Sequence, residues 1–241
     1  MQHISAQNLL AQYQVVLDAF FQSSPDANSE LAEILAQFFA EEQLITLIQQ
    51  LLKDDCGLAE IASRSYQHGN GFLKVVLLEQ CYKLRLHIWF PGHACEENIH
   101  DHRWSFASYI AAGQLNSEIW CDDAQGLTFQ EFEYHAATST HAPFKRDCGE
   151  KTLKLHCAQV NQVGESYVMP KGKLHRIINP GHQLVATIMC SAPTEQGTTR
   201  LIPMHAGIDP NIQPPKTTVS QLRTALQQFL ILLSQDQHHA A

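Results

Sequence analysis

Apolar residues recur with a helical period over roughly the first 66 residues. Apolar side chains at three- and four-residue intervals form three successive stripes, and each stripe predicts a helix with one buried face. The stripes are Leu9, Leu10, Tyr13, Val16, Leu17 and Phe20, then Leu31, Ile34, Leu35, Phe38 and Phe39, then Leu44, Ile45, Ile48, Leu51 and Leu52. Ser24-Pro25 predicts a restart between the first two, because proline fits a first helical turn. We expect residues 1–66 to form a helical segment.

From about Gly69 the period of the apolar residues changes to two, which is typical of strands. Phe72 to Leu78 is one predicted strand, and Tyr82 to Phe90 is a second. In the second strand, apolar residues alternate with Lys83, Arg85, His87 and Trp89. Short strand patterns separated by turn residues continue to about Pro203, which favours a β-barrel or sandwich over residues 67–205.

The C-terminal part, residues 206–241, has a third pattern. Gly207 to Pro215 contains three prolines and predicts an irregular connector. An amphipathic helix is then predicted from the apolar positions Val219, Leu222, Leu226, Phe229, Leu230 and Leu233.

Composition narrows the class of protein. The chain has 241 residues and a formal net charge of −8. It has no basic tract, which argues against a nucleic-acid partner. Its seven cysteines are odd in number and scattered, so we interpret them as reduced thiols of a cytoplasmic protein. The N-terminus lacks the features of a signal peptide, and no apolar run approaches membrane-spanning length.

Two histidines close together in sequence carry the strongest chemical signal. His100 and His102 are separated by one residue, and on a strand such a pair projects from one face. About seventy residues later His175 follows the turn signal Pro170-x-Gly172. Three imidazoles on one side of a metal leave coordination positions open, whereas closed structural sites use four ligands. We therefore predict a metal site at His100, His102 and His175, with Asp101 pointing away from it.

The ligand type restricts the metal without choosing the reaction. Three neutral imidazoles suit Fe(II), Zn, Ni, Cu or Co better than Mg or Ca. The open positions permit either oxygen chemistry or Lewis-acid chemistry. Both reactions stay open at this point.

Lys74, Arg85, His87 and Trp89 are candidate substrate-binding residues. If the apolar side of the strand that carries three of them packs against the helices, the opposite side faces the barrel interior. A buried Arg or Lys there would need an anionic partner, such as a substrate carboxylate. The alternative is a solvated strand face. Tyr167 is one of several aromatic and histidine residues whose spacing in the sequence matches no motif, and we expect it to be structural.

The motif Gly164-x5-Pro170-x-Gly172-x2-His175-x3-Asn179 resembles the second motif of the cupin superfamily at every marked position. The first cupin motif is partial, because His100-x-His102 and Gly113 are present but its glutamate is replaced in the region of Phe106 and Ala107. A missing glutamate is a feature of the three-histidine cupins that include cysteine dioxygenase and related thiol dioxygenases.

The resemblance to cysteine dioxygenase extends over two stretches. Ile99-His100-Asp101-His102-x2-Ser105 looks like its first ligand segment, and Leu174-His175-Arg176-x2-Asn179-x2-His182 looks like its second. Trp89 and Lys74 fall where that family places a pocket tryptophan and a carboxylate-binding arginine.

Departures from that family are also clear. Its cysteine–tyrosine crosslink would need a Cys near Ala107 and a Tyr near Cys190, and both are absent. Its serine and histidine before that tyrosine correspond to Ala186 and Ile188.

The resemblance implies a mainly β fold, a double-stranded β-helix or jelly-roll barrel, with the N-terminal helices and the C-terminal helix packed outside. It implies an Fe(II) dioxygenase that uses O2 on a small anionic substrate, which could be a thiol; Zn or Ni could occupy the purified protein. The alternatives are a non-catalytic metal- and ligand-binding cupin, or a Zn or Ni isomerase or hydrolase. The N-terminal helices would cover a barrel edge or form a homodimer contact.

Overall fold

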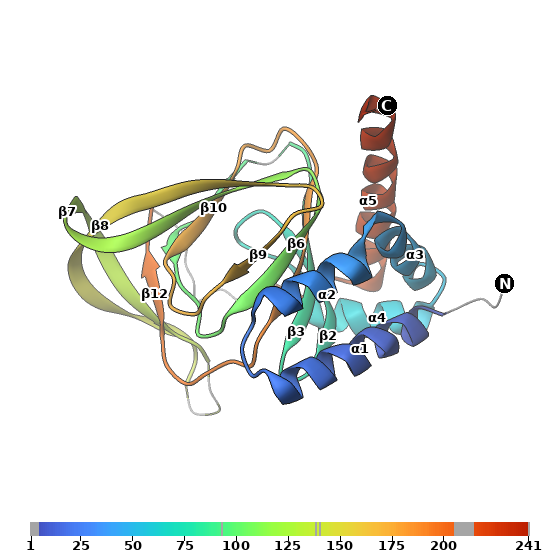
Figure 1. Ribbon diagram of the computed structural model, residues 1–241, viewed down its shortest axis with the longest axis horizontal. Coiled ribbons are helices and arrows are strands. Elements are labelled where there is room, and N and C mark those ends of the chain that lie inside the picture. Colours follow the sequence, from blue (N-terminus) through green and yellow to red (C-terminus); the bar gives the residue numbers. More distant parts are fainter. Residues whose placement is uncertain (1–4, 93, 138, 140, 205–214, 241) are drawn as a thin grey trace.

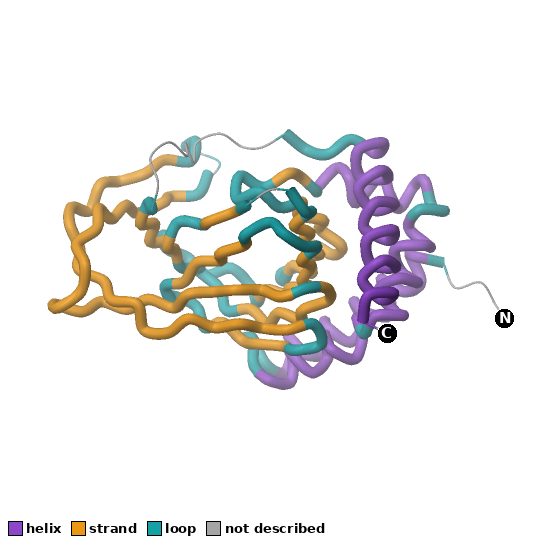
Figure 2. Tube along the Cα trace, turned by 90° about the horizontal axis from the view of Figure 1, so that it is seen from above, coloured by secondary structure: helices purple, strands orange, loops and turns teal. Residues whose placement is uncertain are grey.

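The computed structural model describes residues 5–92, 94–137, 139, 141–204 and 215–240. Helices gather at one end of the molecule and strands make up the rest (Figures 1 and 2). The helices are α1 (Ala6–Ser23), α2 (Ser29–Phe39), α3 (Glu41–Leu51), α4 (Asp55–Arg64) and α5 (Val219–Ala240). The strands are β1 (Tyr66–Gln67), β2 (Leu73–Glu79), β3 (Lys83–Trp89), β4 (Cys95–Glu96), β5 (Ile99–His100), β6 (Phe106–Ala112), β7 (Gln114–His135), β8 (Phe144–Gln162), β9 (Ser166–Met169), β10 (His175–Asn179), β11 (Val185–Ser191) and β12 (Thr199–Ile202).

The N-terminal segment is helical, as predicted, with two differences. The helix α2 begins at Ser29 and not near Pro25, because the Asn28 side chain accepts a hydrogen bond from the backbone N of Leu31 at 3.1 Å and caps the helix there. A fourth helix, α4, has no counterpart among the three predicted stripes. It begins where Asp54 accepts a hydrogen bond from the backbone N of Gly57 at 2.9 Å.

The strands form two six-stranded sheets in which the paired neighbours are antiparallel. The first has the order β1-β2-β3-β11-β6-β9, and the second has the order β4-β10-β5-β12-β7-β8. Strands far apart in the chain are neighbours, such as β3 with β11 and β5 with β10. The two facing sheets form the double-stranded β-helix that the sequence predicted, with helices outside it.

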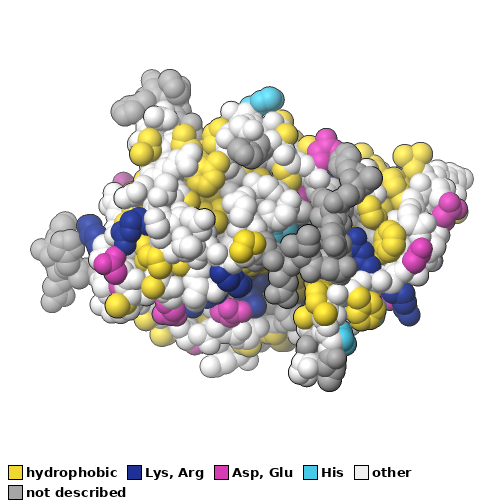
Figure 3. Space-filling model, turned by 180° about the vertical axis from the view of Figure 1, so that it is seen from behind, with side chains coloured by type: hydrophobic (Ala, Val, Ile, Leu, Met, Phe, Trp, Pro, Cys, Tyr) yellow, Lys and Arg dark blue, Asp and Glu magenta, His cyan; other side chains and the backbone are white. Residues whose placement is uncertain are grey.

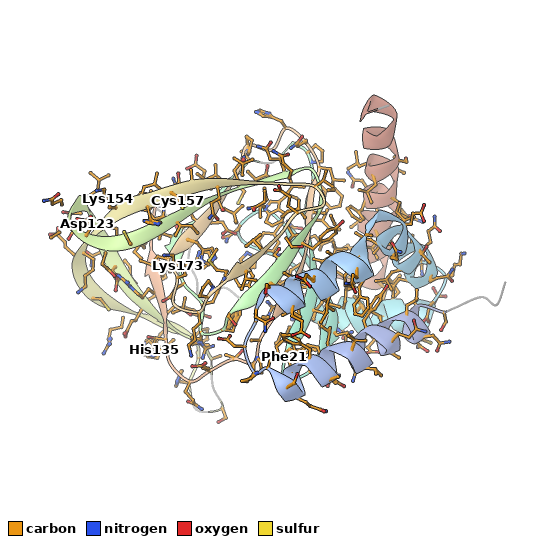
Figure 4. The ribbon with its side chains drawn as sticks, viewed as in Figure 1. Phe21, Asp123, His135, Lys154, Cys157 and Lys173 are labelled. Carbon is orange, nitrogen blue, oxygen red and sulfur yellow. The ribbon has the colours of Figure 1, made fainter. Side chains whose placement is uncertain are left out.

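The first sheet packs its outer face against the helices. Leu84, Leu86 and Ile88 of β3 are fully buried in one apolar cluster with residues of α1 to α5. Tyr82 also joins the two layers. Its ring stacks on Phe21, which is labelled in Figure 4, with 4.9 Å between centroids, and its hydroxyl donates to a carboxylate oxygen of Asp18 at 2.7 Å. The other face of β3 is therefore directed into the barrel.

The strands β7 and β8 are far longer than the short strands that were predicted, with 22 and 19 residues. They form a ribbon that bends where the pairing shifts between Asp122 and Leu127, near the labelled Asp123 and Lys154 (Figure 4). Gly126 is required in this bend, because a Cβ there would lie 2.2 Å from the carbonyl oxygen of Leu153. Beyond the bend the ribbon returns to pair with β12, which extends the second sheet.

The connector predicted from Gly207 to Pro215 lies outside the described residues except for its last position. The C-terminal helix was predicted from Val219 onward, and α5 begins at that residue. Among the described helices, none is long and apolar enough to cross a membrane. On the face in Figure 3, basic and acidic side chains are scattered among other residues.

Candidate metal centre and cavity

Three histidines meet between the last residue of β5 and the first residue of β10. His100 and His175 are paired across these strands, and their ring centroids lie 4.7 Å apart. The His102 ring lies 4.8 Å from that of His100 and 5.1 Å from that of His175. One ring nitrogen of each residue lies within 4.8 Å of the others. The sequence-predicted trio is therefore brought together by the fold.

Backbone carbonyls orient two of the rings. The Nδ1 atom of His100 lies 2.9 Å from the carbonyl oxygen of Asn98, and that of His175 lies 2.9 Å from the carbonyl oxygen of Lys173, which lies in the loop before β10 (Figure 4). A carbonyl only accepts, so Nδ1 carries the proton and Nε2 keeps a free lone pair. His102 is held by stacking on Trp104, with 4.9 Å between centroids.

The protonation of the rings also suits a metal. Burial lowers the pKa of His102 well below its usual value, and burial lowers the pKa of His175 to about 3. Both rings are neutral at pH 7, as metal ligation requires. A facial set of three neutral imidazoles fits a first-row divalent ion.

The strand expectation for the first histidine pair is wrong in one respect. The strand β5 ends at His100, so His102 lies in irregular chain beyond it. Asp101 points away from the trio, as expected, and is buried. Its carboxylate accepts a hydrogen bond from the backbone N of Arg200 at 2.7 Å and thereby attaches β12.

Glycines in the predicted motifs shape the chain around the trio. Gly172 has a φ of +70°, and its backbone N donates to the carbonyl oxygen of His102 at 3.0 Å, which joins the two ligand segments. Gly113 has a φ of +66°, and a Cβ there would lie 2.1 Å from the carbonyl oxygen of Leu184. Asn179 accepts from the backbone N of Gly181 at 2.9 Å and closes the turn after β10.

The N-terminal helices hold the loop that follows His102. In the turn between α1 and α2, the backbone N of Ala27 donates to the hydroxyl oxygen of Ser105 at 2.9 Å. That hydroxyl in turn donates to the carboxylate of Asp26. Ser105 is three residues beyond His102, so the helical segment fixes the end of the ligand loop.

A cavity of about 360 Å³ opens at the trio. The predicted substrate-binding residues Lys74, Arg85, His87 and Trp89 all line it, together with the three histidines. Arg85, His87 and Trp89 are only 8%, 6% and 3% exposed, so the alternative of a solvated strand face is wrong for them. The structure shows this placement, and the binding roles of the four residues stay a prediction.

The cavity holds cations without counter-ions. Among the described residues, no carboxylate oxygen lies within 4.0 Å of the charged nitrogens of Arg85 or Lys74. Within the described part of the chain, Arg85 donates a hydrogen bond from Nη1 to the Sδ atom of Met189 at 3.3 Å. Burial, and then the nearby Arg85, lower the pKa of Lys74 to about 7, while Glu97 acts in the opposite direction.

Glu97 is the one carboxylate among the described lining residues, and it is already engaged. Its oxygens accept from the Asn70 side chain at 2.9 Å and from the backbone N of Ile177 at 3.2 Å. Two further lining histidines are uncharged: burial lowers the pKa of His68 to about 2 and lowers that of His87 well below its usual value. Among the described lining residues, the basic side chains therefore outnumber the acidic one: Lys74, Lys83, Arg85 and Arg103 line the cavity with Glu97.

Several lining residues were not predicted. Tyr66, His68, Asn70 and Phe72 line the cavity and precede Lys74 at two-residue intervals. That alternation was a usable signal. Tyr167, which was expected to be structural, also lines the cavity. It comes from β9, which reaches the site only through its pairing with β6, so no local pattern could indicate it.

The positions that correspond to the crosslink of thiol dioxygenases lie elsewhere than that resemblance implied. Ala107 and Cys190 are opposite each other on β6 and β11, but both pack in the cluster that faces the helices. Ala186 and Ile188 face the same way. On β11 the cavity is lined by Thr187 and Met189 instead.

Comparisons with known proteins identify no family. No family model matches the chain, and no curated protein matches it in sequence. Similar solved structures include an RmlC-like cupin from Shewanella frigidimarina (15% identity, 56% of this chain and 86% of that chain, TM-score 0.35) and a protein with a double-stranded β-helix domain from Klebsiella pneumoniae (16%, 59% and 94%, 0.33). A third is the polyketide cyclase RemF from Streptomyces resistomycificus (13%, 61% and 82%, 0.35). Similarity at this level assigns no activity to this chain.

Proposed function

We propose that the protein is a non-haem Fe(II) dioxygenase that acts on a small anionic molecule. The observation that carries the proposal is the juxtaposition of three imidazoles with a cavity in which, among the described residues, Arg85 and Lys74 have no carboxylate oxygen within 4.0 Å.

Each residue has a distinct role in this proposal. His100, His102 and His175 would hold Fe(II), and iron bound there supplies the electrons that activate O2. Arg85 and Lys74 bind and orient the anionic group of the substrate, since a buried cation gains most from a partner of opposite charge. His87 and Trp89 form the wall beside them and exclude water.

A thiol is an acceptable substrate for this site, but free cysteine is not favoured. The chain lacks the cysteine–tyrosine pair that would form a crosslink, so its intact mass should equal the sequence mass without a loss of two hydrogens. The ammonium group of cysteine would also meet the positive field of Lys74 and Arg85.

Oxygen uptake tests the proposal. The protein is loaded with Fe(II) without air and mixed with O2 and a panel of 3-mercaptopropionate, cysteine, 2-mercaptobenzoate and ring-hydroxylated benzoates. We expect uptake with at least one carboxylate other than cysteine, and at least a hundred-fold lower rate in His175→Ala. No uptake above the rate of free Fe(II) with any member would overturn the dioxygenase.

Two alternatives give different results in the same experiment. A Zn- or Ni-dependent isomerase or hydrolase would convert a substrate without O2, because three imidazoles and an open position also suit a Lewis acid. A binding module would retain the ligand unchanged with every metal. Purified protein can carry Zn or Ni in place of iron, since affinity follows the Irving–Williams order.

A further inference from the structure

Aromatic side chains line the same cavity as the unpaired cations. Six of them come from the inner face of the first sheet and its adjoining loops: Tyr66, Phe72, Trp89, Trp104, Phe106 and Tyr167. Tyr66, Phe72 and Trp89 belong to the β1–β3 side, and Phe106 and Tyr167 to the β6–β9 side. A ligand in the cavity therefore has ring surfaces on two sides.

The rings on the β1–β3 side are packed against one another. The centroid of Phe72 lies 4.7 Å from that of Trp89 and 4.5 Å from that of His68, whose plane is inclined to it by only 15°. These contacts hold the rings in fixed orientations, so they present a preformed aromatic surface. Offset and edge-to-face contacts with a planar ring need such a surface.

The cations lie directly beside these rings. The Nζ atom of Lys74 is 5.2 Å from the ring centroid of Tyr66 and 5.7 Å from that of Phe72. The guanidinium of Arg85 is 5.8 Å from the ring centroid of Trp104, which stacks on His102. The Trp104 ring therefore lies between Arg85 and His102, a proposed metal ligand.

A small hydrated anion does not match these surroundings. Aromatic faces carry negative charge density and give an anion nothing in return for its lost water. A neutral ring, in turn, gives the buried Arg85 no partner of opposite charge. A molecule that combines a planar ring with one carboxylate satisfies both surfaces.

We propose that the cavity binds an aromatic carboxylate, with the carboxylate at Arg85 and Lys74 and the ring among the aromatic side chains between them and the histidine trio. An aromatic carboxylate would then be the substrate class of the proposed dioxygenase. Its oxidation rests on that proposed function, whereas its binding does not. Binding itself needs no turnover.

Direct titration tests the inference. The Zn-loaded and the metal-free protein are each titrated calorimetrically with 2-naphthoate, with decahydro-2-naphthoate and with 2-naphthamide. The second probe keeps the charge and carbon skeleton without the π system, and the third keeps the rings without the charge. We expect 2-naphthoate to bind about ten-fold or more tightly than either control, with or without metal.

Variants separate the two parts of the site. Arg85→Gln should lower the affinity for 2-naphthoate by about ten-fold or more, and should leave the affinity for 2-naphthamide within about three-fold of that of the unmodified protein. Phe72→Leu and Tyr66→Leu should each lower the affinity for 2-naphthoate but not the affinity for decahydro-2-naphthoate. Arg146→Gln removes an exposed cation of the β7–β8 ribbon and should leave the affinity for all three probes unchanged. Retained zinc stoichiometry shows that each variant is folded.

Equal affinity for 2-naphthoate and its saturated analogue would overturn the aromatic part, and equal affinity for the amide would overturn the anionic part. No binding of 2-naphthoate to folded protein, or binding that disappears without metal, would overturn the placement of the carboxylate at Arg85 and Lys74. Binding as proposed without oxygen uptake would keep this inference and reject the dioxygenase.

Discussion

Lys74 is a cavity residue whose charge state changes near neutrality. Burial and repulsion by Arg85 lower its pKa to about 7. The charged groups that act on it are Arg85 and Lys83 from β3, Glu97 from the loop before β5 and Lys216 beside β1. Of these, Glu97 alone favours the protonated amine. The positive charge of the cavity therefore decreases as pH rises through neutrality.

Binding of carboxylates should follow that charge. Because the protonated amine attracts an anion, the affinity for 2-naphthoate should fall by roughly ten-fold between about pH 6 and about pH 8.5, the factor that corresponds to one pKa unit. The bound anion itself favours protonation, so the midpoint should lie above that of the free protein. Calorimetric titration at several pH values measures the effect.

Lys74→Met is the control for this dependence, since it keeps the length of the side chain and removes the amine. If the affinity of this variant for 2-naphthoate still fell with pH in the same way, another group would be the one that titrates, and the role of Lys74 would be contradicted.

Residue-level prediction succeeded where the signal was local. The spacing of His100 and His102, and the turn before His175, are contained in short segments, so the trio could be predicted without knowledge of the fold. The cavity residue Tyr167 could not, because its position depends on the pairing of β9 with β6. The resemblance gave no orientation for Ala107 and Cys190, and the structure packs both against the helices. A shift of one residue along a strand exchanges its two faces, so similarity in sequence alone does not set the orientation.

Among the elements, the β7–β8 ribbon departs most from what was predicted. Arg200 of β12 joins its two halves: it donates to Asp122 beside the bend at 2.7 Å and to Glu131 on the returning half at 2.6 Å. Glu131 is buried, and Arg200 is its ion-pair partner. The sequence around Gly126 is typical of a turn that ends a strand, and only the continued pairing beyond it shows that the strand is bent.

Arg200→Gln should therefore lower the free energy of unfolding by roughly 2–4 kcal/mol, because it leaves a buried carboxylate without its cation. Arg146→Gln is the matched control on the same ribbon: it breaks the exposed pair of Arg146 with Glu133 and should cost less than about 1 kcal/mol. Urea denaturation of the two variants measures the difference. Similar costs for both would contradict the assignment of Arg200 as the residue that holds the bent ribbon.

At the scale of the whole molecule, the helices and the barrel meet at one sheet and at one loop. The change of apolar period near Gly69 predicted the division into helices and strands, since each period belongs to one kind of element. It could not predict which sheet the helices cover, because both sheets contain strands with an apolar side. The contact of Asp26 with Ser105 adds a role for the N-terminal helices, which place the loop after His102.

Metal stoichiometry measures the central claim most directly. Protein reconstituted with Fe(II) without air, or with Zn, is dialysed and analysed for bound metal by elemental analysis. We expect about one ion per chain in the unmodified protein, nearly none in His175→Ala, and about one in His156→Ala, which alters an exposed histidine of β8. Circular dichroism should show all three to be folded. A full ion retained by folded His175→Ala, or no bound metal in the unmodified protein, would contradict a metal centre at His100, His102 and His175.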